Sequence, residues 1–138
     1  MWVVATAGGE PRRICSGLWV LLNPSGTLIV ARNDGTQVRL FEVSTENGPE
    51  RAIAVNPDTR FQSIGGVRAD GVLAATVITA DSWFIQLALV DLTSGRTTRL
   101  AGDGTSEVVS AAWTREGQIL ALKQGMDATI WTFTRNGQ

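Results

Sequence analysis

The sequence has no histidine, no tyrosine and a single cysteine, Cys15, and these absences exclude several kinds of site. Without an imidazole the chain cannot assemble Ser-His-Asp or Cys-His catalysis, because both need that ring to carry the proton. Without histidine or a second cysteine, one chain cannot form the common zinc sites or an internal disulfide. Catalysis would have to use carboxylates, lysine or a carboxylate-bound metal. We therefore expect a protein that is not an enzyme and has neither a cofactor nor a metal.

The chain also lacks an excess of charge and a long apolar run. It carries 12 basic and 13 acidic residues, so its net charge of −1 gives no field to hold a polyanion, and we expect neither nucleic acid nor a membrane as partner. No stretch approaches the roughly 18 apolar residues of a spanning helix. The start, residues 1–9, lacks the features of a signal peptide. We expect a product that is not exported as written, whereas a leader removed from the start would place it in the periplasm or outside the cell.

What the sequence does contain is a repeat of strand, tight turn and strand. The turns are Pro24-Ser25-Gly26, Ala69-Asp70-Gly71 and Arg115-Glu116-Gly117, and their glycines lie 45 and then 46 residues apart. Each turn follows one short apolar run and precedes another. A strand-based period of about 40 to 50 residues is typical of the blades of a β-propeller. The sequence therefore predicts an all-β fold built of four-stranded antiparallel blades.

Alignment on these glycines divides the single domain, residues 1–138, into repeat units. It predicts a half-blade at 1–16, four-stranded blades at 17–62 and 63–107, and a three-stranded blade at 108–138. The predicted strands are 2–7, 12–15, 18–22, 27–32, 37–44, 51–55, 63–68, 72–80, 83–92, 97–101, 108–114, 118–123 and 128–134.

About three blades cannot readily close a ring, because propellers carry four to eight blades that pack face to face. Each open end would expose an apolar sheet face, which marks an interface. We expect oligomerisation to close the ring, with a homodimer supplying six blades, or seven if the half-blade is a shared element. The alternative is that the chain is a piece of a longer propeller.

Two hairpins carry a resemblance to a known family. In residues 8–14 and 90–100 the chain turns at a glycine and returns through basic residues, which resembles the outer hairpin of TolB-type propellers. The repeated turns are similar to that family's Pro-Asp-Gly turn, although no copy keeps the full triplet, and the Gly-His signature of WD-repeat propellers is absent. The resemblance implies a scaffold for protein contacts, often periplasmic or appended to enzymes and signalling proteins.

Three aspartates recur between the predicted second and third strands of the units. Asp34, Asp81 and Asp127 lie 47 and 46 residues apart, and the loops that hold them should share the face of the channel mouth. Repeated carboxylates there could hold a hard cation or a basic ligand. The stronger interpretation is a turn role, because an aspartate side chain accepts hydrogen bonds from its own backbone.

The connections between consecutive blades, 56–62 and 102–107, are the longest irregular segments, and loops often carry function. Their candidate binding residues are Asn56, Asp58, Arg60, Asp103 and Glu107. Pro57-Asp58 is also an ordinary turn signal.

Trp83 is the candidate for an exposed aromatic contact, whereas the other tryptophans are expected to pack between sheets. Cys15 is expected to be a small packed side chain. The leading hypothesis is a non-enzymatic propeller that binds a protein or peptide through its loop-bearing rim. The alternative is a sensor or hydrolase-type propeller with a carboxylate site at the channel mouth, and a third possibility is a structural subunit whose only partner is itself.

Overall fold

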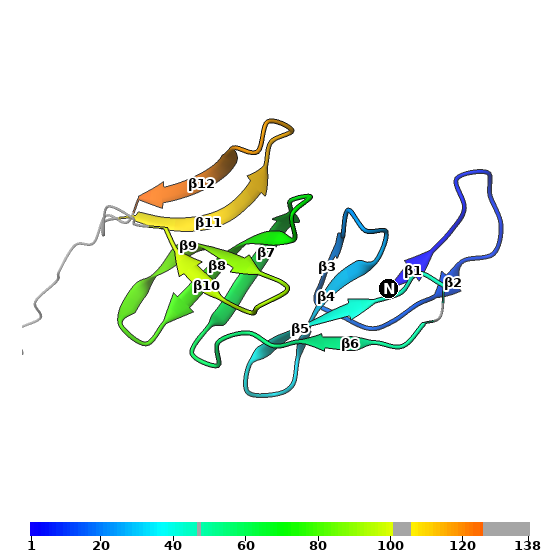
Figure 1. The fold of residues 1–138 in the computed structure, drawn as a ribbon, viewed down its shortest axis with the longest axis horizontal. Coiled ribbons are helices and arrows are strands. Elements are labelled where there is room, and N and C mark those ends of the chain that lie inside the picture. Colours follow the sequence, from blue (N-terminus) through cyan, green and yellow to red (C-terminus); the bar gives the residue numbers. More distant parts are fainter. Residues whose placement is uncertain (47, 101–105, 126–138) are drawn as a thin grey trace, which may run out of the picture.

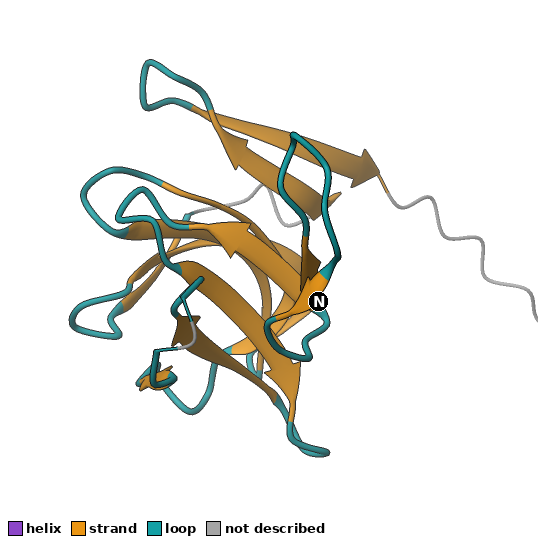
Figure 2. Cartoon of the chain, turned by 90° about the vertical axis from the view of Figure 1, so that its right-hand side faces the viewer, coloured by secondary structure: helices purple, strands orange, loops and turns teal. Residues whose placement is uncertain are grey.

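The structure is a computed structural model that describes residues 1–46, 48–100 and 106–125. Throughout these ranges the regular elements are β-strands joined by loops, and Figure 2 shows this all-β character. No helix long and apolar enough to cross a membrane occurs in them. The predicted all-β class is confirmed.

The strands of the described residues form four antiparallel sheets (Figure 1). The N-terminal hairpin consists of β1 (Trp2–Val3) and β2 (Arg12–Arg13). Sheet I consists of β3 (Trp19–Leu22), β4 (Leu28–Asn33), β5 (Val38–Val43) and β6 (Arg51–Ile53). Sheet II consists of β7 (Arg60–Val67), β8 (Val72–Thr79), β9 (Ser82–Asp91) and β10 (Thr97–Arg99). The C-terminal hairpin consists of β11 (Ser106–Trp113) and β12 (Ile119–Gly125).

Sheets I and II are simple meanders in which each strand pairs with the next along the chain. The turn glycines Gly26, Gly71 and Gly117 have φ values of 87°, 81° and 79°, which residues with a Cβ rarely adopt. This requirement explains why a glycine ends each repeated turn. Two successive four-stranded meanders are compatible with a blade-like arrangement.

Two strands begin two or more residues earlier than the sequence predicts. Strand β7 begins at Arg60, because Phe61 turns inward and is buried between two exposed neighbours, and β11 begins at Ser106. Bulges in β7 hide the alternation of inward and outward residues from a reading of the sequence. The assignment of Arg60 and Glu107 to connecting loops was therefore wrong, since both lie in strands. The predicted strand 128–134 lies outside the described residues.

The main core lies between sheets I and II. It joins residues of the first sheet to residues of the second in one buried cluster: Ile29, Ala31, Leu40 and Ile53 with Phe61, Ile64, Leu73, Ala75, Val77, Ala88, Val90 and Leu92. A smaller cluster packs Cys15 against Val30 and Val43 on the other face of sheet I. Cys15 is buried, as predicted.

Candidate functional site

Three connections lie at one end of sheets I and II, along the lower side of Figure 1. They are the β4–β5 turn, the β6–β7 connection and the β8–β9 turn. Because the strands of a meander alternate in direction, every second connection returns to the same end. These connections place Asp34, Asp81 and the polar residues after β6 along a single edge, which we call the rim.

Two adjoining clefts run along this rim. The first has a volume of about 320 Å³ and lies between sheet II and the β6–β7 connection. Its lining residues are Asn56, Asp58, Thr59, Thr79, Ala80, Asp81, Thr97 and Arg99. The second, of about 340 Å³, is bounded by β5, β6 and the same connection, and it shares Asn56 and Thr59 with the first. We call the two clefts together the rim groove.

Asp81 is held by an ion pair inside the first cleft. The Arg99 guanidinium donates from Nη1 to both carboxylate oxygens at 2.8 and 2.9 Å, and the Thr79 hydroxyl donates to Oδ1 at 2.6 Å. The hydrogen bond from Thr79, followed by that from Arg99, lowers the pKa of Asp81. This carboxyl therefore stays ionised near neutral pH and cannot serve there as a general acid.

The β6–β7 connection is organised by Asn56. Its side-chain oxygen accepts the backbone N–H of Asp58 at 3.0 Å, and its backbone carbonyl accepts the N–H of Thr59 at 3.0 Å. The buried Thr59 hydroxyl then donates to Thr97 Oγ1 at 3.3 Å, which ties the connection to β10. Within the described part of the chain, the Asp58 carboxylate forms no ion pair, so it is available to a partner.

Asp34 has the predicted turn role. Its Oδ1 accepts the backbone N–H groups of Thr36 and Gln37 at 3.0 and 2.9 Å, and its other oxygen pairs with Arg39. The two backbone hydrogen bonds, from Gln37 and then Thr36, are the main reason that the pKa of Asp34 lies far below its usual range. Arg39 also lines the second cleft, so this turn borders the rim groove.

The other predicted residues are divided between the rim and places away from it. Asn56, Asp58 and Asp81 come together around the first cleft. Trp83 is 96% exposed on β9, but it does not line the groove. Arg60 and Glu107 lie in β7 and β11 and do not line it either. Asp103 and Asp127 lie outside the described residues.

Sequence reasoning missed the threonines and arginines that complete the rim groove. Thr59, Thr79 and Thr97 supply hydroxyls, while Arg39 and Arg99 neutralise the two aspartates. Their signal in the sequence is weak, because threonine and arginine are common on the outward faces of strands. Only the pairing of β5 and β10 with their neighbours brings these side chains to the aspartates.

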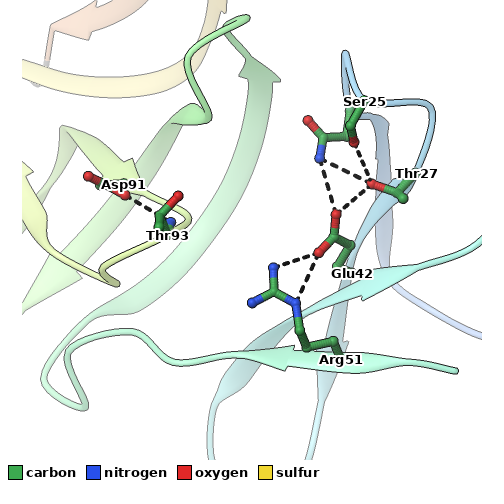
Figure 3. A network of polar contacts seen from close by, with 7 residues as sticks. Ser25, Thr27, Glu42, Arg51, Asp91 and Thr93 are labelled. Carbon is green, nitrogen blue, oxygen red and sulfur yellow. Dashed lines mark hydrogen bonds and ion pairs between the residues drawn. The ribbon is translucent and has the colours of Figure 1, made fainter.

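A second polar cluster, also missed, lies at the opposite end of sheet I and is drawn in Figure 3. The Glu42 carboxylate accepts hydrogen bonds from Thr27 Oγ1 at 2.8 Å and from Arg51 Nη2 at 2.6 Å. Arg51 and then Thr27 lower the pKa of Glu42. These bonds tie the β3–β4 turn to β5 and β6, so the cluster holds the edge of the sheet in place.

Among residues 1–46, 48–100 and 106–125, no group of three or more cysteine, aspartate and glutamate side chains is placed to hold a metal ion. No family model matches the chain, and no curated protein and no solved structure matches it. The geometry of the rim groove and the internal repeat therefore carry the functional argument.

Proposed function

We propose that this chain is a TolB-type β-propeller scaffold, without enzymatic activity, that binds a protein or peptide segment in the rim groove. Support comes from the regular repeat of turns, from the two successive four-stranded meanders and from the basic return strand of the outer hairpin. Propellers usually bind partners where their loops meet at one face, and the groove lies among such loops.

The observation that carries the proposal is the mixed lining of the groove. The first cleft offers the hydroxyl of Thr97 and the side-chain amide of Asn56, which suit the N–H and C=O groups of an extended peptide. The second cleft adds the apolar side chains of Val38 and Val55. A few fixed polar groups beside an apolar surface are typical of a recognition site.

The charge of the groove indicates what kind of peptide fits. Asp81 is already neutralised by Arg99, whereas Asp58 is not paired with any cation in the described ranges. A lysine or arginine of the partner would therefore bind at Asp58. We propose a segment that places one basic side chain next to an apolar one.

No observation favours the alternative, a carboxylate site for a metal ion. The carboxylate oxygens of Asp34 accept hydrogen bonds from backbone N–H groups and pair with Arg39. The carboxylate of Asp81 is bound by Arg99 and Thr79. A cation would have to displace an arginine from each aspartate. Asp127, the third residue of that hypothesis, lies outside the described part of the chain.

A peptide library tests the proposal. Two pools of labelled decapeptides, one with a lysine or arginine beside an apolar residue and one with glutamate in place of the basic residue, are bound to the protein. We expect the basic pool to bind preferentially, and Asp58→Asn to weaken it about fivefold, the size of an exposed ion pair.

Asp70→Asn is the control, because Asp70 is also an exposed aspartate, lies in a turn at the opposite end of sheet II and pairs with Arg68. It should leave peptide binding unchanged. Equal binding of both pools, or equal loss in the two variants, would contradict a partner site in the rim groove. If neither peptide pool binds and the protein associates only with itself, the chain is a structural subunit instead.

A further inference from the structure

In the second strand of each repeat unit, alternate residues point toward the unit that follows along the chain. Three and five places after the turn glycine of sheet I come Ile29 and Ala31, which are 1% and 0% exposed and pack in the core shared with sheet II. The residues at the same two places in sheet II are Ala74 and Thr76, both 0% exposed. They lie on the face of β8 away from sheet I, and strand β11 packs along that face. These positions therefore face the following unit.

The third copy of these positions is followed by no further unit among the described residues. In β12 the same places after Gly117 hold Leu120 and Leu122, which are 66% and 62% exposed. An apolar outer face on a repeat unit attracts other molecules unless another unit covers it. We call this apolar surface of the C-terminal hairpin the leading face.

In the first strand of a unit, alternate residues point the other way, toward the preceding unit. In β7, Ile64 and Val67 pack back into the core shared with sheet I. Strand pairing places Ile64 opposite Ala75 and Val67 opposite Leu73, and the corresponding pairs in sheet I join Val20 to Val30 and Leu22 to Leu28. Val20 and Leu22 thus occupy the positions that contact a preceding unit.

These two residues are nevertheless exposed, at 40% and 69%. The N-terminal segment covers only part of the same face of sheet I, where Cys15 packs on Val30 and Val43. The surface in front of β3 stays open. We call the exposed surface formed by Val20 and Leu22 the trailing face.

We propose that a second copy of this chain occupies these surfaces, with the leading face of one copy packed on the trailing face of the other. The contact repeats one that the chain makes twice within itself, from sheet I to sheet II and from sheet II to the C-terminal hairpin. Because the two faces differ, the contact is heterologous, and such contacts close into rings or continue as open chains. Two copies form the smallest closed ring.

Two substitutions test this arrangement by complementation. Leu122→Asp places a charge on the leading face only, and Leu22→Asp places one on the trailing face only; both side chains are exposed, so the cores are untouched. Light scattering of the unaltered protein at about 100 µM should give a mass of two chains, against 14.7 kDa for one. Each variant alone should give the mass of one chain. An equimolar mixture should regain a two-chain species, because one intact leading face meets one intact trailing face.

The outcomes against the proposal are equally defined. A single-chain mass for the unaltered protein overturns it, as does either variant that keeps the two-chain mass. A mixture that stays monomeric while circular dichroism shows both variants folded overturns the head-to-tail arrangement. Trp83→Asp is the control, because Trp83 is 96% exposed and lies on neither face; it should keep the two-chain mass, and an equal loss there would also overturn the assignment. The self-association depends on packing between sheets and not on peptide binding. A monomer that still binds basic peptides would therefore overturn the self-association and leave the proposed peptide binding standing.

Discussion

At the scale of single residues, Asp34 and Asp81 hold corresponding places in two repeat units but have different hydrogen-bond partners. The structure gives Asp34 a turn of backbone N–H groups and Asp81 a threonine and an arginine. Both side chains are ionised and have partners. Their repeated positions therefore reflect where hairpin turns fall in the repeat, because aspartate suits such turns.

Asp34 should make stability depend on pH. Its folded-state pKa lies below the value of about 3.9 in an unfolded chain, so the ionised group stabilises the fold above that value. This contribution is lost as the pH falls through the folded-state pKa. Asp34→Asn keeps an oxygen that can accept the backbone N–H groups but loses the charge. We expect the variant to have a lower urea midpoint at pH 7 and a gap to the original protein that shrinks toward pH 2; a gap that is constant with pH would contradict this role.

At the scale of elements, the close approach of β7 and β11 joins sheet II to the C-terminal hairpin. A Cβ added to Gly65 would lie 1.7 Å from the carbonyl oxygen of Ala111. Glycine at this point lets two backbones approach each other more closely than any side chain would permit. One residue later, a Cβ on Gly66 would meet Trp113 at 3.6 Å, an ordinary contact.

This difference predicts opposite results for two neighbouring substitutions. Gly65→Ala must push β7 and β11 apart and should lower the free energy of unfolding by about 1 to 3 kcal/mol. Gly66→Ala meets no clash and removes backbone freedom from the unfolded chain, so it should be neutral or slightly stabilising. Urea unfolding of both variants is the measurement. Equal destabilisation by the two substitutions would show that the close contact at Gly65 does not determine how sheet II packs on the C-terminal hairpin.

At the scale of the whole molecule, two apolar sheet surfaces stay exposed among the described residues. The faces are the leading face, Leu120 and Leu122, and the trailing face, Val20 and Leu22. The corresponding positions between sheets I and II and between sheet II and the C-terminal hairpin are buried or partly buried. The free energy of unfolding should therefore depend on whether the leading face of one copy packs on the trailing face of another.

A protein stabilised by self-association unfolds at a temperature that rises with its concentration. We expect the unfolding midpoint to rise by about 3 to 8 °C between about 2 and about 200 µM, because mass action favours the assembled folded state. Leu122→Asp should show no such rise. Scanning calorimetry or fluorescence at several concentrations measures it, and an invariant midpoint of the unaltered protein would contradict assembly through these faces.

The sequence by itself determined most of the described strands, their order and the turns between them. Glycines at the turns and short alternating apolar runs are local signals, so strands such as β4, β5 and β8 could be predicted to within one or two residues. The same signals predicted that Asp34 forms a turn and that Cys15 is buried.

Only the tertiary structure decided which distant side chains meet. Bulges in β7 made Arg60 look like part of a loop, and strand pairing within sheet II brought Arg99 to Asp81 and placed Thr97 beside Thr59. It also decided which alternate residues face a neighbouring sheet and which face solvent. Alternation along one strand distinguishes two faces, but the partner of each face is a property of contacts between segments far apart in the chain.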